Sequence, residues 1–515
     1  MKNYLLLYFT ISIFLIFFSC SDDQVSNPIG NQAPDTGLFL YPDSTINQQP
    51  SKLHVHWWGD DPDGVVEGFY IMWDGIDSTW GFTRSNDSIF TLPIGTSDTT
   101  YKFFVASVDA EGGNENYDNS IIRNGISFGA EPFTDLNGNG KYDEGETFVD
   151  IGLVDPTPAE LNFPIKNTAP TLQWNALTVL PDTSFPVMTF KWDADDLDGI
   201  ETIQAINISL NDTTNFVTLN GSARLVTIRI KDLNTTPPEM EILINGSDQN
   251  IFPETLFGLQ LNSENKIYVQ AVDLSGAVSN RISLPDTGSV WYVKKPKGQL
   301  LIFDDFDGSS SEQVKIFYRN EFNSIGLQNK YDEYDLVNQK LPFESVTVYE
   351  MMKLFKYTFW YSVSNPRLDL LNNVTNKYLG QGGKIAFSMT FQSSSGNYEF
   401  DLSTLQGFLP IDTVSSPLSF LYSGADIIPS SQSVNYPTLK TTATISSVRT
   451  FIPNSVVTDS VYSIANPNIS GNIGFITKDK TEFFIGLPLY DCDGGSQNVD
   501  ELLSKIFFEE FGLVP

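Results

Sequence analysis

Histidine is almost absent from this chain of 515 residues, and its scarcity excludes several kinds of site. Only His54 and His56 occur, so the last 459 residues, from 57 to 515, contain none. A Ser-His-Asp or Cys-His catalytic apparatus in the C-terminal half is therefore excluded, as are histidine-based zinc sites there. The two histidines are spaced by two residues on an expected strand, so they share one face. Two ordinary strand residues are favoured over a weak surface metal site.

Cysteine is equally rare, because the chain contains only Cys20 and Cys492. If Cys20 is modified, as the residues around it indicate below, Cys492 has no partner for a disulfide. Stability must then come from packed cores. The length of 515 residues is enough for about three domains.

Positive charge is scarce as well: 30 Lys and Arg stand against 63 Asp and Glu, a formal net charge of −33. Nucleic acid is excluded as a partner, because phosphate binding needs clustered basic residues. The same charge would be repelled by an anionic membrane surface, so electrostatic attraction would not hold the protein there. Acidity by itself names no partner.

The N-terminus carries a long apolar run, "YLLLYFTISIFLIFF", between Lys2 and the pair Ser19-Cys20. About fifteen residues are too few for a membrane span but fit the core of a secretory signal. The stretch resembles a bacterial lipoprotein signal peptide over residues 1–19, and "SDD" at 21–23 resembles the export tag of Bacteroidetes-type surface lipoproteins. The resemblance implies lipidation of Cys20 and a lipid-anchored, surface-exposed position at the cell outer membrane. An ordinary secretion signal with cleavage elsewhere is the alternative.

A polar tether at residues 20–34 leads into an internal repeat. "WWGDDPDGVVEGFYIMW" at 57–73 matches "WDADDLDGIETIQAINI" at 192–208, and "YKFFVASVDAEGG" at 101–113 matches "KIYVQAVDLSG" at 266–276. Alternating strands, separated by Asp/Gly-rich turns and containing a tryptophan, predict an antiparallel sandwich.

Each copy resembles a fibronectin type III or related immunoglobulin-like domain, with Trp57 and Trp192 on the second strand. Tyr101 stands where that family keeps its tyrosine corner, and the second copy has Asn265 there. Such domains act as spacers, present other parts of a protein or bind partners through their loops, and they are seldom enzymes. The expected bounds are 35–167 for the first sandwich, 168–297 for the second, and 212–260 for an insertion in the second.

From residue 298 strands alternate with helices, which predicts a parallel sheet with right-handed crossovers. The segments "YLGQGGKIAF" and "FFIGLPLY" resemble the class I glutamine amidotransferase-like, flavodoxin-type fold. That resemblance implies an α/β domain with a mainly parallel sheet over 298–515. The residues at about 400–470 are strand-like and rich in Ser and Thr, and they are left unassigned. The fold class is thus multidomain, with two all-β sandwiches followed by an α/β domain.

The resemblance also implies that this last domain is non-catalytic. Glutamine amidotransferases place a cysteine in a sharp turn after a strand, but the comparable strand end here, "KIAFSMTF", has Ser388 and no cysteine. Cys492 lies in another segment, "LYDCDGG".

The stretch "LLIFDDFDGSS" supports an enzymatic alternative. Its "DFDGS" resembles the D-x-D-G-T motif of haloacid-dehalogenase-type phosphatases, which implies Asp305 as nucleophile and Asp307 as acid/base, with magnesium. No lysine-plus-acidic-pair motif follows in order, and ordinary turn carboxylates at the edge of a sheet are favoured. A glycosidase needs two carboxylates and no histidine, so composition leaves that alternative open.

The stretch "FTDLNGNGKYDEGETFVD" at 133–150 matches the complete D-x-[DN]-x-[DN]-G-x5-E pattern of an EF-hand calcium loop. Calcium prefers six to eight oxygen ligands, which this spacing can converge on one ion. Its flanks lack the EF-hand helices, so we expect a structural, EF-hand-like loop inserted at about 115–152 in the first sandwich. A solvated Asp/Asn/Gly turn is the alternative. The expected calcium ligands are Asp135, Asn137, Asn139, the backbone carbonyl of Lys141, Asp143 and Glu146.

The sequence therefore predicts a lipid-anchored, calcium-stabilised envelope protein with a non-enzymatic binding or scaffold role. Its ligand would be an extracellular protein or glycan. The alternative is a hydrolase, phosphatase-like or carbohydrate-active, with its site in the C-terminal domain.

Overall fold

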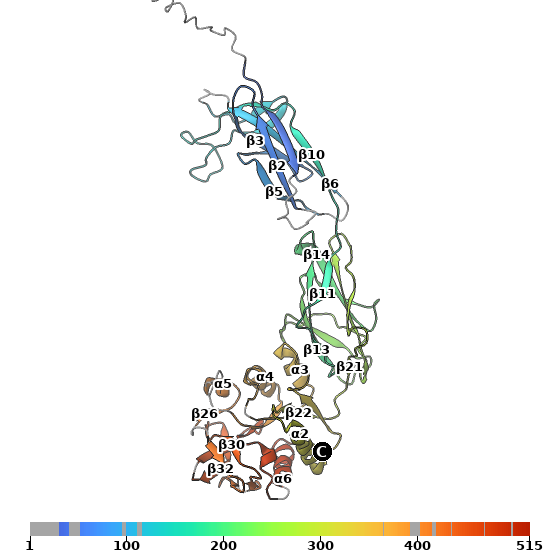
Figure 1. Ribbon diagram of the computed structural model, residues 1–515, viewed down its shortest axis with the longest axis vertical. Helices are drawn as coiled ribbons and strands as arrows, with labels where there is room; N and C mark the ends of the chain where they lie inside the picture. The colour runs from blue at the N-terminus through green and yellow to red at the C-terminus, as the bar shows by residue number, and fades with distance from the viewer. Residues whose placement is uncertain are drawn as a thin grey trace, which may run out of the picture. The chain divides into compact units, whose positions relative to one another are not determined.

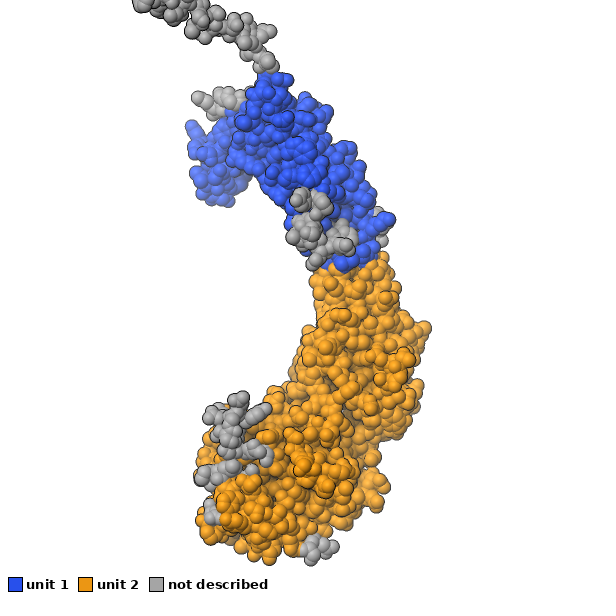
Figure 2. Space-filling view, viewed as in Figure 1, with its two compact units in different colours: residues 1–168, 197–199 blue, residues 169–196, 200–515 orange. Residues whose placement is uncertain are grey.

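A computed structural model (Figure 1) describes most of the chain. The described residues are 30–40, 52–94, 99–110, 116–363, 365–391, 402–414, 419–433, 435–467, 469–495 and 498–514. The expected signal peptide and Cys20 lie outside them. The chain forms two compact units, residues 1–168 with 197–199 and residues 169–196 with 200–515 (Figure 2). No helix in the described ranges is long and apolar enough to cross a membrane.

The first unit is a two-sheet sandwich, as the repeat predicts. One sheet has the order β1-β2-β5; the other has the order β10-β6-β3-β4, with β9 also paired to β6. All these pairs are antiparallel. This division of strands is that of a fibronectin III-like sandwich, so the prediction is confirmed. The bounds are β1 (Asp35–Leu40), β2 (Lys52–Asp60), β3 (Val66–Asp74), β4 (Asp77–Thr83), β5 (Asp87–Thr91), β6 (Thr99–Ala110), β9 (Ile151–Val154) and β10 (Ala159–Ile165).

Two aromatic residues, Trp57 and Tyr101, stabilise this sandwich at the positions that the sequence predicts for them. Trp57 is fully buried between the sheets and packs against Phe69 and Phe103, at ring-centroid distances of 6.3 and 5.7 Å. The hydroxyl of Tyr101 donates to the carbonyl of Pro93 at 2.8 Å, eight residues upstream. That bond is a tyrosine corner, which ties the start of β6 to the preceding loop.

Between β6 and β10 the chain inserts a smaller lobe, which forms a second apolar cluster together with β3 and β6 of the sandwich. The hairpin of β7 (Ile121–Arg123) and β8 (Ile126–Gly129) turns through Asn124 and Gly125, both with positive φ, which the tight Asn-Gly turn requires. The lobe buries Tyr70, Ala106, Val108, Ile121, Phe128, Ile151 and Val154. The EF-hand-like loop begins just after this hairpin.

The second sandwich repeats this plan with additions. Its main sheets have the orders β11-β13-β16-β17 and β15-β14-β19-β20, and a third sheet has the order β12-β21-β18. Trp192 is fully buried on the second strand of the main sheets, as predicted. The strand β17 and the residues up to 262 have no counterpart in the first sandwich. The bounds are β11 (Thr171–Trp174), β12 (Thr183–Ser184), β13 (Val187–Asp195), β14 (Ile203–Leu210), β15 (Val217–Asn220), β16 (Leu225–Ile230), β17 (Met240–Ile244), β18 (Ser263–Glu264), β19 (Ile267–Asp273), β20 (Ile282–Leu284) and β21 (Tyr292–Val293).

Asn265 occupies the position of the tyrosine corner and closes the loop differently. Its side-chain nitrogen donates to the carbonyls of Gln260 and Ser263 at 2.8 and 2.9 Å. Its oxygen accepts from the backbone N–H of Gln260 and from the amide of Asn211. The buried amide therefore fixes the preceding loop by three hydrogen bonds within five residues and ties it to Asn211 by a fourth, where the first sandwich uses one hydroxyl.

The C-terminal domain is built on one mixed sheet of eleven strands. The strands β23, β22, β24, β25 and β34 are parallel neighbours in that order. Numbered along the chain this order is 2-1-3-4-5, that of flavodoxin-like sheets. Their bounds are β22 (Leu300–Asp305), β23 (Tyr331–Asp335), β24 (Tyr357–Ser362), β25 (Lys384–Met389) and β34 (Glu482–Ile485).

The prediction of a mainly parallel sheet is wrong, because antiparallel strands continue the sheet beyond β34. Most of them come from the residues at about 400–470 that the sequence left unassigned, and β33 follows directly after that stretch. Long alternating strands joined by short turns pair as hairpins, and hairpin strands are antiparallel. The bounds are β26 (Ile411–Val414), β28 (Asp426–Pro429), β29 (Leu439–Lys440), β31 (Phe451–Pro453), β32 (Thr458–Asn466) and β33 (Ile469–Thr477), with β27 (Ser419–Leu421) and β30 (Ile445–Val448) in a separate pair.

Helices cover both faces of the parallel strands. Buried side chains of α2 and α6 join one apolar cluster with Leu300 and Ile302, and those of α3 and α4 join another with Leu301 and Phe303. Because both faces are covered, the strands read as continuous apolar runs such as "LLIF". The bounds are α2 (Ser311–Phe322), α3 (Ser345–Met352), α4 (Leu368–Gly380), α5 (Leu402–Gln406) and α6 (Asn498–Ser504).

Within the second unit, the second sandwich is joined to the C-terminal domain by a buried ion-pair network. The guanidinium of Arg229 on β16 donates to Glu350 of α3 at 2.6 Å and to Glu241 at 2.8 Å. Lys353 lies 3.0 Å from the other oxygen of Glu350, whose side chain is 1% exposed. The Glu350 carboxylate is therefore compensated from both sides of the junction.

Neutral contacts extend this junction. The hydroxyls of Thr189 and Thr347 are 2.5 Å apart, and the rings of Phe185 and Phe355 meet edge-to-face at 5.1 Å. The sequence-based boundary between the two domains thus falls inside one packed unit.

We expect Arg229→Leu to lower the free energy of unfolding of the second unit by about 3 kcal/mol, because the buried Glu350 loses its partner across the junction. Glu350→Leu should also lower the free energy of unfolding. The double variant should lose less unfolding free energy than the two single variants added together, with a coupling energy of about 2 kcal/mol. Urea unfolding of the four proteins measures this. In the matched cycle Lys231→Leu and Glu239→Leu, an exposed pair at 3.5 Å, coupling should stay within about 0.5 kcal/mol. Equal coupling in both cycles would contradict the account.

Candidate functional site

The two adjacent carboxylates at the end of β22 serve opposite faces of the sheet, because strand side chains alternate. Asp304 faces α2, where the ammonium of Lys315 lies 3.3 Å away. Asp305 faces α4: its Oδ2 accepts from the backbone N–H of Arg367 at 3.0 Å and from the indole N–H of Trp360 at 3.2 Å. The predicted acidic cluster is therefore divided between two environments.

Asp305 is 3% exposed, and burial raises its pKa to about 6 against the hydrogen bonds from Arg367 and Trp360. It sits at the start of α4, where a carboxylate interacts favourably with the free N–H groups of the helix. Its backbone carbonyl accepts from the hydroxyl of Ser362 at 2.8 Å. Asp307, the partner expected from the phosphatase resemblance, is exposed beyond the strand end. The carboxylate of Asp305 thus serves to join β22, β24 and α4.

Ser388 and Cys492 are also structural groups in this domain. The hydroxyl of Ser388 donates to the carbonyl of Leu487 at 2.9 Å and accepts from the backbone N–H of Leu489 at 3.1 Å. It is 1% exposed. The thiol of Cys492 is fully buried and donates to the carbonyl of Pro488 at 3.4 Å, and burial raises its pKa. Both side chains are thus buried and hydrogen-bonded within the domain.

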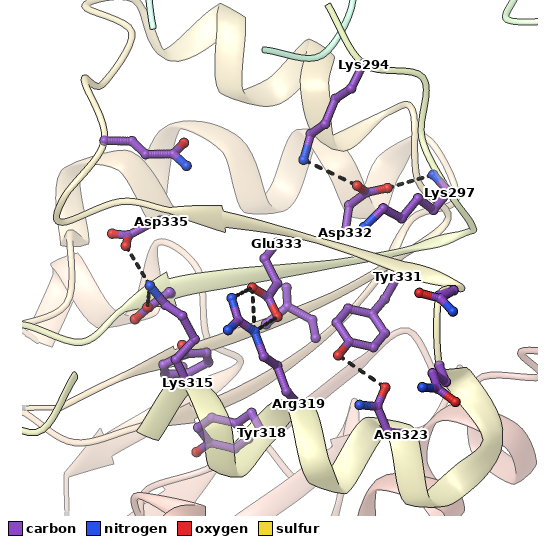
Figure 3. A pocket seen from close by; sticks show the side chains of 16 residues that line it. Lys294, Lys297, Lys315, Tyr318, Arg319, Asn323, Tyr331, Asp332, Glu333 and Asp335 are labelled. Atoms are coloured by element: carbon purple, nitrogen blue, oxygen red, sulfur yellow. Dashed lines mark hydrogen bonds and ion pairs between the residues drawn. The ribbon is translucent and has the colours of Figure 1, made fainter. Parts of the chain in front are cut away.

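A pocket of about 470 Å³ lies beside the edge strand β23, between that strand and α2 (Figure 3). Sequence reasoning missed it, although the charged stretch "YDEYD" at 331–335 marks an unusual strand. Acidic and basic side chains line the pocket in equal number, so it is locally neutral in a strongly acidic chain. They are Asp304, Asp332, Glu333, Asp335, Lys294, Lys297, Lys315 and Arg319.

Ion pairs link three of the bases in this pocket to its four acids (Figure 3): Lys294 to Asp332, Arg319 to Glu333, and Lys315 to both Asp304 and Asp335. Arg319 donates from Nε and Nη2 to the carboxylate of Glu333, at 2.7 and 2.6 Å. Lys315 lies 2.9 Å from Asp335. Burial acts to lower the pKa of Lys315, but the hydrogen bonds and charges of Asp335 and Asp304 together outweigh burial and raise it. Such a pocket suits a polar ligand without a large net charge.

In the EF-hand-like loop, the first and last predicted ligands close the loop by hydrogen bonds to the backbone. Oδ1 of Asp135 accepts from the N–H of Gly138, and Oδ2 accepts from that of Gly140, both at 2.7 Å. The bond from Gly140 contributes most to lowering the pKa of Asp135. Glu146 is 7% exposed and accepts from Leu136 at 2.8 Å and from Asp143 at 2.9 Å.

The middle ligands converge on one point. The side-chain nitrogens of Asn137 and Asn139 donate to Oδ2 of Asp143 at 2.6 and 2.7 Å. Calcium ligation through their oxygens requires both amides to rotate. Counting only His, Cys, Asp and Glu, no group of three or more in the described part of the chain is placed to hold a metal. The calcium site therefore stays a prediction, as does the ligand role of the Lys141 carbonyl.

Aromatic rings, and not helices, support the loop. Phe133 and Phe148 form an antiparallel bridge at its base. Tyr142 of the loop stacks on Tyr117, with ring centroids 4.0 Å apart and an interplanar angle of 11°. The buried Glu131 accepts from the backbone N–H of Asp118 and Ile151, which fixes the base to the lobe.

Comparisons with known proteins leave the family open. No protein family matches the chain, and no curated protein matches it. A two-domain fibronectin type III segment of chicken tenascin is 11% identical and covers 49% of this chain and 97% of its own, with a TM-score of 0.20. Fibronectin(III)-like modules of Clostridium thermocellum CbhA are 11% identical, covering 50% and 94%, with a TM-score of 0.15. The chicken interferon gamma receptor alpha chain is 8% identical, covering 49% and 97%, with a TM-score of 0.18. These scores are too low to support a functional assignment.

We expect Asp305→Asn to change how stability depends on pH. The folded pKa of about 6 lies above the ordinary value of 3.8, so the wild-type carboxyl favours folding when protonated and opposes it when charged. Relative to the variant, the wild type should lose most of about 3 kcal/mol as the pH rises from 4 to 7.5. Urea unfolding at several pH values measures the difference. For the exposed control Asp307→Asn, the difference in unfolding free energy from the wild type should stay constant across these pH values within about 0.5 kcal/mol. A pH-independent difference for Asp305→Asn would refute the assignment.

Proposed function

We propose that this chain is a lipid-anchored protein of the cell envelope with a non-enzymatic binding or scaffold role at the outer surface. The observation that most supports the non-enzymatic role is that polar side chains at the strand ends of the C-terminal domain are occupied by hydrogen bonds within the chain. Asp305 and Ser388, which a hydrolase there would need free, are buried and hydrogen-bonded within the chain. In the neighbouring pocket all four acids are ion-paired to lining bases, which suits binding better than turnover.

The sandwiches fit a presenting role. Fibronectin III-like domains hold other parts of a chain at a distance and offer loops and sheet faces for contact. The junction at Glu350 makes the second sandwich and the C-terminal domain one unit. An extracellular protein or glycan is the proposed partner class.

The turnover test uses the purified chain without its signal peptide. We expect no hydrolysis of p-nitrophenyl phosphate above that of the Asp305→Asn variant, because the carboxylate is already hydrogen-bonded and buried. Activity in the wild type that is absent from a folded Asp305→Asn protein would establish the phosphatase alternative and overturn the binding role. The pH measurement above shows whether the variant is folded.

The anchor is proposed from Cys20 and the residues before it. Mass spectrometry of the N-terminal peptide should find a diacylglyceryl group on its sulfur, and Cys20→Ser should move the protein out of the membrane fraction. A bare thiol on the intact membrane-associated chain would overturn this part of the proposal.

We propose structural calcium in the EF-hand-like loop, held by Asp135, Asn137, Asn139, the Lys141 carbonyl, Asp143 and Glu146. The charge of the ion would offset the repulsion among three carboxylates and stabilise a polar loop that buries little apolar surface. Extracellular calcium is abundant, so weak binding is enough.

Calcium at about ten times its dissociation constant should raise the unfolding free energy of the first unit by about 1.4 kcal/mol. Its melting midpoint should rise by about 4 °C. Calorimetry in EDTA and in calcium measures this. Glu146→Gln should abolish the calcium-dependent rise, because it removes the carboxylate that closes the ligand shell. Glu144→Gln, an exposed change in the same loop, should retain it. The same midpoint with and without calcium would exclude the site.

A further inference from the structure

The outward face of the β1-β2-β5 sheet carries an unusual set of side chains. On β2, Val55 and Trp57 point into the core and are fully buried. The alternate residues His54, His56 and Trp58 therefore point outward. They include both histidines of the chain, and Trp58 is 48% exposed.

Neighbouring strands complete an exposed apolar patch around these residues. Phe39 on β1 is 39% exposed, and its ring lies 4.9 Å from that of His56 and 5.7 Å from that of Trp58. Ile89 on β5 is opposite His54 in the strand register and is 56% exposed. We call Phe39, His54, His56, Trp58 and Ile89 the aromatic face.

The position of Trp58 depends on a glycine. A Cβ atom at Gly37 would lie 2.1 Å from an atom of the six-membered ring of Trp58, so only glycine lets the ring lie over β1. The ring is therefore held against the sheet by its own strand neighbours. An exposed tryptophan that is supported in this way is preorganised for contact, and it costs little entropy to bind through it.

The size of the aromatic face indicates a small ligand. The exposed parts of Phe39, Trp58 and Ile89 amount to about 300 Å², well below the roughly 800 Å² per partner of a stable protein interface. A protein docked here would need most of its contact elsewhere.

The polar groups on the aromatic face indicate what kind of ligand it can bind. His54 lies 2.9 Å from Asp87, and His56 lies under Phe39. A purely apolar ligand would cover these groups without offering hydrogen bonds, which is costly. The ligand must combine an apolar face with a hydroxyl-rich edge. A pyranose ring has this combination, because its axial C–H groups form one face and its hydroxyls form the rim.

We propose that the aromatic face binds a sugar ring of a neutral glycan, stacked on Trp58 with its hydroxyls toward His54, His56 and Asp87. The inference rests on the proposed binding role and adds to it a ligand class and a site in the first unit. The turnover, anchor and calcium tests do not depend on it.

Isothermal titration of the full chain without its signal peptide tests the proposal with cellohexaose, chitohexaose and mannohexaose. We expect at least one probe to bind with a dissociation constant of about 1 mM or tighter. Trp58→Ala should weaken that binding by about tenfold or more, the scale expected for losing one stacked aromatic ring. Gly37→Ala should weaken it as well, because it displaces the ring while keeping the indole.

The matched control is Ile122→Ala, which removes an exposed apolar side chain (59% exposed) from another sheet of the same unit and should leave binding unchanged. Circular dichroism and melting show that the variants are folded. Three results would overturn the proposal: no binding of any probe at about 5 mM, binding that Trp58→Ala leaves intact, or self-association of the wild type that Trp58→Ala abolishes. The last result would assign the face to a second copy of the chain.

Discussion

Burial of carboxylates is the constraint on which the packing of the C-terminal domain depends. A carboxylate removed from water needs hydrogen bonds or an opposite charge, and the chain supplies them from its own elements. Asp305 receives them from Trp360 and from the start of α4, and Glu350 receives them from Arg229 and Lys353. Each of these acids therefore joins elements that are distant in sequence.

The features that depend on local periodicity could be predicted from the sequence. The buried Trp57 and Trp192 and the tyrosine corner of Tyr101 follow from alternation, turn residues and internal repetition. The strand "LLIF" at 300–303 follows from a short continuous apolar run. Alternation also places Asp304 and Asp305 on opposite faces of the sheet, so the strand pattern itself argues against a single acidic cluster at "DDFD". The ligand set of the calcium loop rests on spacing alone and stays a prediction.

The features that depend on which strands become neighbours could not be predicted. The antiparallel part of the C-terminal sheet comes from residues whose pattern fits several partners, and pairing there is decided by tertiary packing. The pocket was missed for a similar reason. Its acids lie mainly on β23, a short strand with three acidic residues that strand propensity disfavours, and its bases come from α2 and from the stretch before β22. Only the folded sheet brings the two sets together.

The placement of Glu350 also limits how this protein could have been assembled from parts. Recombination at the sequence boundary near residue 297 would separate α3 from β16 and leave a deeply buried acid without Arg229. Exchange of either module alone would be selected against, so the pair should be inherited together. The first sandwich belongs to the other compact unit, so the ion pairs of Glu350 place no such limit on its exchange.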